Sequence, residues 1–329
     1  MDGAGVVTAV AAGQATVSAI ADGVTAYALV TVSVPEAAPV TRWTTMPSGT
    51  TTGLSNVWGA SATDVYAVGG GLWHYDGSSW SPVATGTNAY LLDVWGASAS
   101  DLFAVGGTSY YRGSMAYVDA YVGRRNGSTW LWGLVSIGPA GGGSPSLWGA
   151  SPRDVFLGGA VWMGAILAFD GLWWASTACS AATGYCGTRS IWGTSASNVF
   201  IAGIGRALHW DGAAWTSMTV GTTATLTAVW GTSPTDVFAV GSGGTILHFD
   251  GVSWSAMNSG TTTSLSDVWG TAATNVYAVG GDGTILHYDG SSWSPMASGT
   301  TVPLSGIWGT TPTTVFIVGS GGTILQGTP

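Results

Sequence analysis

Short stretches of alternating apolar and polar residues recur along the chain, and residues 265–296 contain one complete set of them. Within this segment LSDVWG, NVYAVG, TILHYD and SSWSPM each have the period-two pattern that is typical of a half-buried strand. Small polar residues and glycines separate these stretches, and Asp289-Gly290 provides the positive φ angles of a two-residue hairpin turn. The pattern predicts four antiparallel strands in one unit.

This unit is repeated along the chain. The tryptophan-glycine pair of the first strand occurs seven times, with its tryptophans at Trp58, Trp95, Trp148, Trp192, Trp230, Trp269 and Trp308. An aromatic residue follows each tryptophan by eight positions, and a glycine follows it by eleven. A recurrence of about 40 residues with four strands per period predicts an array of four-stranded blades.

The tryptophan of the fourth strand shows how the array closes. After the seven first strands it occurs only six times, at Trp80, Trp130, Trp174, Trp215, Trp254 and Trp293. The last copy lacks it, whereas Trp43 precedes Trp58 by fifteen residues, the same distance as from Trp293 to Trp308. The sequence therefore predicts an all-β fold, a seven-bladed β-propeller over residues 41–329 in which an N-terminal strand completes the last blade.

The residues before the propeller have a different pattern. Residues 4–35 alternate with period two and are interrupted at Gly13 and at Asp22-Gly23. The segments GVVTAVAAGQATVSA and VTV resemble the closing strands of a bacterial group-2 Ig-like domain, so residues 1–36 are expected to form a partial Ig-like module and residues 37–40 a linker. Since a half sandwich exposes apolar edges, we expect these strands to pair with another chain or with upstream sequence, which would make the protein multimeric.

The repeats also resemble a known group of propellers. The residues that carry the resemblance are Leu226, Val240-Gly241, Gly244-Thr245-Ile246, Asp250-Gly251, Trp254 and Ser259-Gly260-Thr261. They are similar to the repeats of Asp-box and Ycf48-like propellers, and the match covers residues 41–329. The Trp-Gly pair and a DGxxW turn depart from those families, so a photosynthetic assembly role is not implied. The Trp-Gly variant resembles repeats in large surface proteins of gliding predatory bacteria.

Charge and composition indicate the class of protein and its cellular location. The net charge is −9 and all seven basic residues are arginines, which is not the pattern of a nucleic-acid-binding protein. A lysine-free chain rich in Thr, Ser and Gly, with Cys179 and Cys186 in one loop, indicates a secreted or cell-surface bacterial protein in which the two cysteines form a disulfide. No apolar run suits a membrane span or a signal peptide, so the chain is expected to be a fragment of a longer protein without membrane insertion.

Candidate metal ligands align with the repeat. Nine of the sixteen acidic residues stand at repeat turns, where hydrogen bonds to nearby backbone explain them, and calcium binding at these turns is the alternative. The four histidines (His74, His209, His248 and His287) occupy one slot of the third strand in four different blades. Shared coordination is therefore not expected, and the sequence predicts no metal site and no cofactor.

Three insertions distinguish blades two to four. They lie in the connection between the second and third strands of copy two, around residues 107–125, and in two connections between blades, residues 135–146 and 175–190. Both kinds of connection emerge on one face of a propeller, so we expect a binding surface there that consists of Tyr110, Tyr111, Arg112, Tyr117, Arg124, Arg125, Trp132 and Trp173. The alternative is that Trp132, Trp162 and Trp173 pack beneath the longer loops.

These residue types favour binding over catalysis. A sialidase-like or two-carboxylate site would need acids in the mouth of the ring, but the only glutamate, Glu36, precedes the propeller, and Asp119 has no evident second carboxylate. We expect a non-enzymatic adhesion or assembly module whose partners are other protein chains or cell-surface polysaccharide. A polysaccharide-binding lectin is the first alternative, and a polysaccharide lyase or glycosidase is the second.

Overall fold

The computed structural model describes residues 13–21, 24–32, 39–112, 115–139, 145–159, 166–177 and 187–329. The chain divides into two compact units, Met1–Ala38 and Pro39–Pro329. In the described part of the first unit, β1 (Gly13–Ala21) pairs antiparallel with β2 (Val24–Val32). The described part holds this one hairpin and no second sheet, so the Ig-like module expected from the sequence is not supported. The two cysteines, and with them the predicted disulfide, lie outside the described residues.

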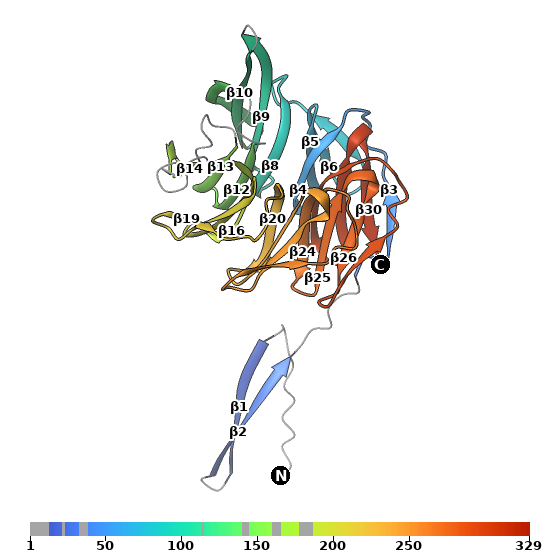
Figure 1. Cartoon of the computed structure of the whole chain (residues 1–329). Coiled ribbons are helices and arrows are strands. Elements are labelled where there is room, and N and C mark those ends of the chain that lie inside the picture. The colour runs from blue at the N-terminus through green and yellow to red at the C-terminus, as the bar shows by residue number, and fades with distance from the viewer. Residues whose placement is uncertain are drawn as a thin grey trace. The chain divides into compact units, whose positions relative to one another are not determined.

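The second unit is the predicted propeller of seven four-stranded antiparallel sheets (Figure 1). Blades one to three comprise β4 (Leu54–Ser61), β5 (Asp64–Gly69), β6 (Leu72–Tyr75), β7 (Trp80–Val83); β8 (Tyr90–Ser98), β9 (Asp101–Arg112), β10 (Met115–Asn126), β11 (Thr129–Pro139); and β12 (Ser146–Ser151), β13 (Asp154–Gly158), β14 (Leu167–Phe169), β15 (Trp174–Ser176). Blades four and five comprise β16 (Thr188–Ser195), β17 (Asn198–Gly203), β18 (Arg206–Trp210), β19 (Trp215–Met218); and β20 (Leu226–Ser233), β21 (Asp236–Gly241), β22 (Ile246–Phe249), β23 (Trp254–Met257). Blades six and seven comprise β24 (Leu265–Ala272), β25 (Asn275–Gly280), β26 (Ile285–Tyr288), β27 (Trp293–Met296); and β28 (Leu304–Thr311), β29 (Thr314–Gly319), β30 (Ile324–Thr328), β3 (Arg42–Thr45).

The ring closes as the tryptophan spacing predicted. Strand β3 pairs antiparallel with β30, with Trp43 opposite Gly327. Backbone hydrogen bonds at both ends of the pair, from Thr41 N to Thr328 O and from Met46 N to Ile324 O, measure 2.9 Å. The N-terminal strand is thus the outer strand of the seventh blade.

The repeated Trp-Gly pair joins each blade to the next. The tryptophan ring of one first strand covers the glycine of the following first strand, so that Trp192 lies over Gly231 and Trp230 over Gly270. A Cβ atom on either glycine would stand only 2.8 Å from that ring. The same contact occurs at all seven blade junctions, including Trp308 over Gly59, which closes the ring. Glycine is therefore required here by the close approach of an aromatic side chain.

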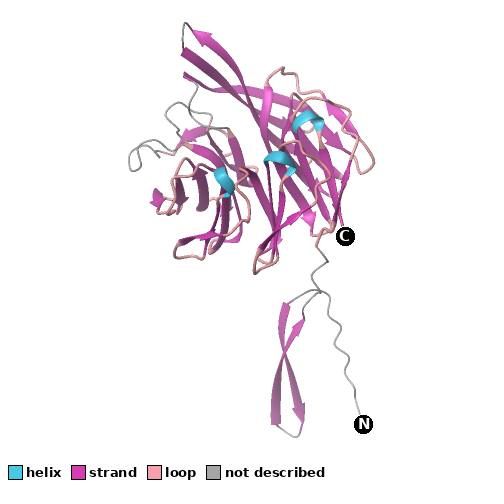
Figure 2. Ribbon diagram, turned by 45° about the vertical axis from the view of Figure 1, so that its right-hand side comes forward, coloured by secondary structure: helices cyan, strands magenta, loops and turns pink. Residues whose placement is uncertain are grey.

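The connection between the second and third strands is short in the last three blades. It forms single 3₁₀ turns, η2 (Ser242–Gly244), η3 (Gly281–Gly283) and η4 (Ser320–Gly322), which are the only helical elements among the described residues (Figure 2). No helix in the described part of the chain is long and apolar enough to cross a membrane.

Blade two differs from the expectation. The inserted residues 107–125 do not form a loop, because β9 and β10 continue as one long hairpin with Met115 opposite Arg112 (Figure 1). The inserted sequence contains four tyrosines, two valines and a threonine, residue types that favour strands. Strand β11, with eleven residues, accompanies the hairpin for most of its length, whereas the outer strands of the other blades have three or four residues.

Candidate functional site

The structure does not bring the eight predicted binding residues together. Tyr110, Tyr111, Arg112 and Tyr117 lie at the far end of the β9–β10 hairpin, with Tyr110 opposite Tyr117, and their side chains are outside the described part. Arg124 stands seven positions along β10 from Tyr117, or roughly 23 Å at the rise of a strand. The predicted set is therefore split between the two ends of the blade.

Both arginines at the near end of β10 have structural partners. Arg124 forms a bidentate ion pair with Asp101, with both nitrogen-oxygen distances at 3.0 Å, and its guanidinium lies 5.2 Å from the centre of the Phe103 ring. Arg125 donates hydrogen bonds to the carbonyls of Ala99 and Gly127 and to the Tyr66 hydroxyl of blade one. These contacts fix the turn end of blade two, and they leave both side chains partly exposed.

The two predicted tryptophans have opposite environments. Trp132 stacks on Trp130, with ring centres 5.5 Å apart, and donates a hydrogen bond of 2.8 Å to the Thr85 carbonyl, so its partners lie outside the longer loops. Trp173 has 76% of its surface exposed. It follows the Asp170-Gly171 turn, where the Asp170 carboxylate accepts hydrogen bonds from Leu172 N and Trp173 N. This turn holds Trp173 outward at the turn end of blade three.

Exposed apolar side chains gather at one cavity between blades two and three. A cavity of about 330 Å³ lies between β11 and blade three, and its lining includes Arg124, Leu131, Leu134, Leu172 and Trp174. Of these, Leu131 is 67% exposed, Leu134 49% and Leu172 78%. Three of the seven large hydrophobic residues that are exposed in the described chain therefore line one groove, which we call the blade-two/three groove.

A second cavity occupies the centre of the ring. It has a volume of about 300 Å³ and is lined by residues at the start of all seven first strands. In six of these strands the pairing register shifts at this point, so that one residue is left out of the ladder. The six bulged residues, all of which line the cavity, are Ser55, Leu92, Arg189, Thr227, Ser266 and Ser305. The bulges direct two consecutive side chains of a strand toward the central channel.

Two aspartates at this level, the buried Asp93 and the partly buried Asp267, connect neighbouring blades. The Asp93 carboxylate accepts hydrogen bonds from Val94 N at 2.8 Å and from Leu147 N of the next blade at 2.7 Å. Asp267 repeats the arrangement with Val268 N at 2.9 Å and Ile307 N of the next blade at 2.8 Å. The amide of Asn56 also donates to Asp93 at 2.5 Å. The carboxylates thus satisfy backbone donors that lack a strand partner.

Burial perturbs the ionisation of both aspartates. It raises the pKa of Asp93 to about 7, although the hydrogen bonds from Leu147 and Val94 act in the opposite direction on this pKa. It also raises the pKa of Asp267 to about 7, and the negative charge of Asp93 adds to that increase in pKa. The charge of Asp93 therefore influences the ionisation of Asp267.

The sequence interpretation overlooked these residues. Asp93, Ser190 and Asp267 occupy the second position before the first-strand tryptophan, where other copies have Asn56, Ser146, Ala228 and Gly306. Comparing that position across the seven copies would have identified it as a variable site within a constant frame. Arg189, one position earlier in its repeat, is the one charged residue at the equivalent bulge positions.

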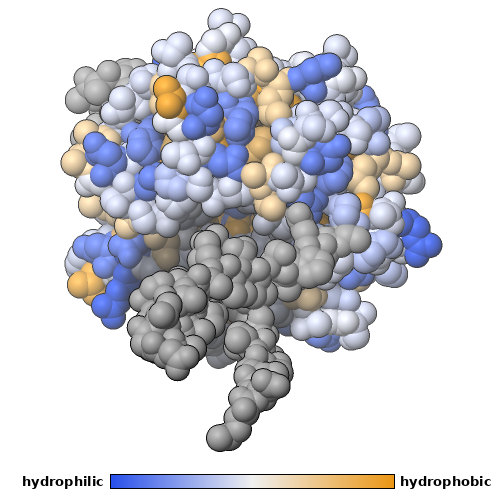
Figure 3. Space-filling model, turned by 90° about the horizontal axis from the view of Figure 1, so that it is seen from below, coloured by the Kyte–Doolittle hydropathy of each residue, from blue (hydrophilic) through white to orange (hydrophobic). Residues whose placement is uncertain are grey.

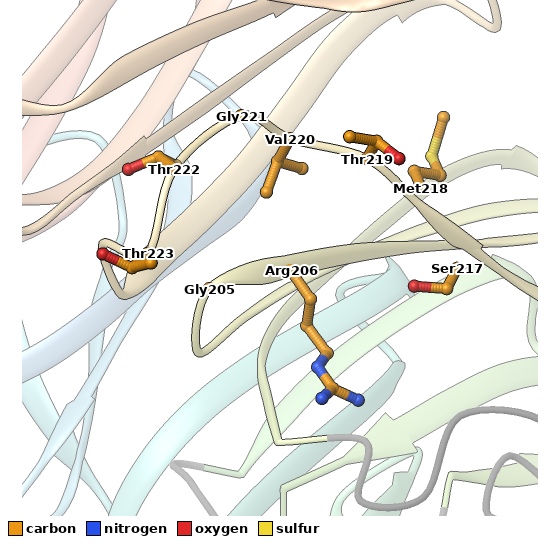
Figure 4. A pocket seen from close by; sticks show the side chains of 9 residues that line it. All are labelled: Gly205, Arg206, Ser217, Met218, Thr219, Val220, Gly221, Thr222 and Thr223. Carbon is orange, nitrogen blue, oxygen red and sulfur yellow. The ribbon is translucent and has the colours of Figure 1, made fainter.

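We assign no binding site to two further features of the surface. A surface depression of about 860 Å³ in blade four is lined by residues 217–223 with Gly205 and Arg206, and Figure 4 shows the Arg206 side chain extending away from the Thr222–Thr223 turn. On the part of the molecule that Figure 3 shows, strongly hydrophobic residues are scattered among polar ones.

The histidines and acidic turns have local partners, as the repeat suggested. His74 contacts Asp64 and His248 contacts Asp236, each at 2.7 Å, and His287 contacts Asn275 at 2.8 Å. At the turns, hydrogen bonds from Ser78 and Ser79 lower the pKa of Asp76 to about 2. Among the described residues, no group of three or more His, Cys, Asp or Glu residues is placed to hold a metal ion.

Comparisons with known proteins agree with the architecture. No protein-family model and no curated protein matches the chain. The structure of YCF48 bound to D1 peptide is similar with a TM-score of 0.63 and 16% identity, over 89% of this chain and 100% of that chain. YCF48 from Cyanidioschyzon merolae matches with a TM-score of 0.62 and 17% identity, over 87% and 99% of the two chains. The WD40 β-propeller domain of Doa1 matches with a TM-score of 0.63 and 10% identity, over 88% and 96%. Likeness at these identities shows the propeller fold and no specific function.

Proposed function

We propose that this chain is a non-enzymatic protein-binding module of a secreted or cell-surface bacterial protein, and that it binds its partner in the blade-two/three groove. The observation that carries the proposal is the concentration of Leu131, Leu134 and Leu172 at one groove, because the surface of a soluble protein rarely gathers exposed apolar residues without an interaction to make. The fold supports it, since propellers are widely used for binding, and the similar YCF48 structure contains a D1 peptide.

The long outer strand indicates the shape of the partner. Strand β11 is the last strand of its sheet, so one edge of its backbone has no neighbour within the blade. Such an edge accepts an extended peptide as an additional strand, while the adjacent cavity takes one large apolar side chain. We therefore expect an extended, apolar segment of another protein in this groove.

Selection of binding peptides on the whole chain tests the proposal. Peptides from a random display library would be measured against the wild type, the triple variant Leu131→Ser, Leu134→Ser and Leu172→Ser, and the control Val252→Ser, which alters an 89% exposed residue on blade five. The triple variant should bind at least about tenfold more weakly, as expected when anchor side chains are removed. The control should keep wild-type affinity, and both variants should melt within a few degrees of the wild type. Equal affinity for the triple variant would reject the groove.

A polysaccharide-binding lectin is the second candidate. The outward Trp173 ring favours it, since an exposed tryptophan offers a flat apolar face for stacking on a sugar ring. A glycan array on the wild type and on Trp173→Ala separates the two candidates. The lyase or glycosidase alternative is checked by turnover assays on polyanionic polysaccharides.

The remaining expectations from the sequence complete the proposal. Secretion is supported by the lysine-free composition, and a disulfide between Cys179 and Cys186 would show in the intact mass as the loss of two hydrogens in oxidising buffer.

We also propose that residues 1–36, with their resemblance to a partial Ig-like module, pair with another chain. Light scattering checks this multimer, and a monomer whose segment 1–36 resists proteases would argue against it.

A further inference from the structure

The central channel combines charges of both signs in a small polar cavity. Asp93 belongs to blade two, Arg189 to blade four and Asp267 to blade six, and all three line the cavity of about 300 Å³. Arg189 therefore lies two blades from each aspartate around the ring. The hydroxyl groups of Ser55, Ser146, Ser190, Ser266 and Ser305 add further polar lining.

Arg189 is not satisfied by the protein around it. Among the described residues it forms no ion pair, and its Nε atom is buried without a hydrogen-bond acceptor. A buried donor without an acceptor is unfavourable, and more so when it is charged. Because Arg189 is a bulge residue that lines the channel, an anionic group in the channel would meet a guanidinium that has no carboxylate partner among the described residues.

The Asp267 carboxylate can still accept further hydrogen bonds. Each carboxylate oxygen has two lone-pair sites, and Asp267 uses one site on each oxygen for the amides of Val268 and Ile307. Asp93 accepts from Val94, Asn56 and Leu147 and also from the Ser146 hydroxyl, so its four acceptor sites are filled. These hydrogen bonds hold both carboxylates in fixed positions at the channel wall, where Asp267 can accept from a cationic group and Asp93 adds negative charge.

We propose that the channel binds a small zwitterion of the free α-amino acid class, with its carboxylate on Arg189 and its ammonium group toward Asp93 and Asp267. A simple cation would meet the unpaired charge of Arg189, and a simple anion would meet two carboxyl groups. A ligand with both groups complements all three side chains. The volume of about 300 Å³ is at the lower end for ligand sites and restricts the ligand to a compact molecule.

Thermal shift and calorimetric titration of the whole chain with the twenty common L-amino acids test this site. At least one amino acid at millimolar concentration should raise the melting temperature in a dose-dependent manner. Its N-acetyl derivative, which lacks the ammonium charge, and its amide, which lacks the carboxylate, should each bind at least about tenfold more weakly. Arg189→Met should reduce affinity to a similar extent, whereas Arg206→Met, the same change elsewhere in blade four, should leave it unchanged.

Three results would overturn the proposal. They are the absence of any shift in the wild type, equal binding of the blocked derivatives, and unchanged affinity in Arg189→Met. If Arg189→Met does not fold, Asp267→Asn provides the second variant, because it preserves side-chain size and removes the carboxylate that faces the ammonium group. Unchanged affinity in Asp267→Asn would then reject the site. Peptide binding in the blade-two/three groove is independent of these outcomes.

Discussion

At the residue scale, the Trp-Gly pair is the contact on which the ring depends. Tryptophan supplies a large buried surface, and glycine allows the ring of the preceding blade to lie directly against the backbone. Sequence periodicity identified both residues as structural, but it did not show that the tryptophan of one repeat contacts the glycine of the next. The pair acts between repeats, which explains why the two residues recur together.

Alanine at one of these glycines should destabilise the propeller. In Gly270→Ala the new methyl group would stand 2.6 Å from the Asn275 carbonyl and 2.8 Å from the Trp230 ring. Overpacking of this kind costs about 1–3 kcal/mol in the free energy of unfolding. Gly133→Ala is the matched control, because no atom lies within 4 Å of the added carbon and it should change that free energy by less than about 0.5 kcal/mol. Urea denaturation measures both, and equal stability of the two variants would contradict the packing role.

At the element scale, the first strands are tied to one another by side chains as well as by packing. A bulge in six of these strands leaves backbone amides near the channel, and Asp93, Asp267 and Ser190 accept hydrogen bonds from the next blade. These links place two carboxyl groups where burial disfavours their charged form. Their ionisation is therefore coupled to stability.

Stability should decrease as the pH rises through the titration of these two groups. Their pKa is about 3.8 in the unfolded chain and about 7 in the folded protein. Between about pH 4 and pH 7 the folded protein therefore binds protons that the unfolded chain has released, and the free energy of unfolding falls as pH rises through this window. Because one unit of pKa corresponds to about 1.4 kcal/mol, the loss is at most a few kcal/mol for each group.

Asp93→Asn should remove part of this pH dependence. Urea denaturation at about pH 4.5 and pH 7.5 would compare the variant with the wild type and with Asp282→Asn, a change at an exposed turn aspartate. The difference in unfolding free energy between the two pH values should shrink in Asp93→Asn and remain at the wild-type value in Asp282→Asn. An unchanged difference in Asp93→Asn would mean that its carboxyl does not titrate in this window.

At the scale of the whole molecule, the propeller is stabilised by joining its two ends. Strand β3 lies beside β30 although nearly 280 residues separate them along the chain, and Val40 N donates a 3.0 Å hydrogen bond to the Tyr277 hydroxyl of blade six. Trp43, 8% exposed, belongs to the core cluster between blades six and seven. The closing strand therefore contributes to the core as well as to the sheet edge.

Removal of the closing strand should cost far more stability than removal of the residues before it. Deleting residues 1–46 eliminates Val40 and Trp43 from the core, whereas deleting residues 1–38 leaves β3 in place. Loss of one buried tryptophan alone costs about 3–5 kcal/mol, so the longer deletion should lower the melting temperature by roughly 10 °C relative to the shorter one. Calorimetry on both truncated chains provides the measurement. Equal melting temperatures would contradict closure by β3.

The sequence by itself determined the number of blades, their strand order and the strand that closes the ring. Each repeat encodes its own hairpins, and the spacing of the tryptophans shows that Trp43 belongs to a fourth strand. Tertiary structure decided which residues share a site. Tyr117 and Arg124 belong to one insertion but lie toward opposite ends of one strand, whereas Asp93, Arg189 and Asp267 are far apart in sequence and line one channel. Periodicity reports the position of a residue within its own blade. Only closure of the ring places equivalent positions of different blades around one cavity.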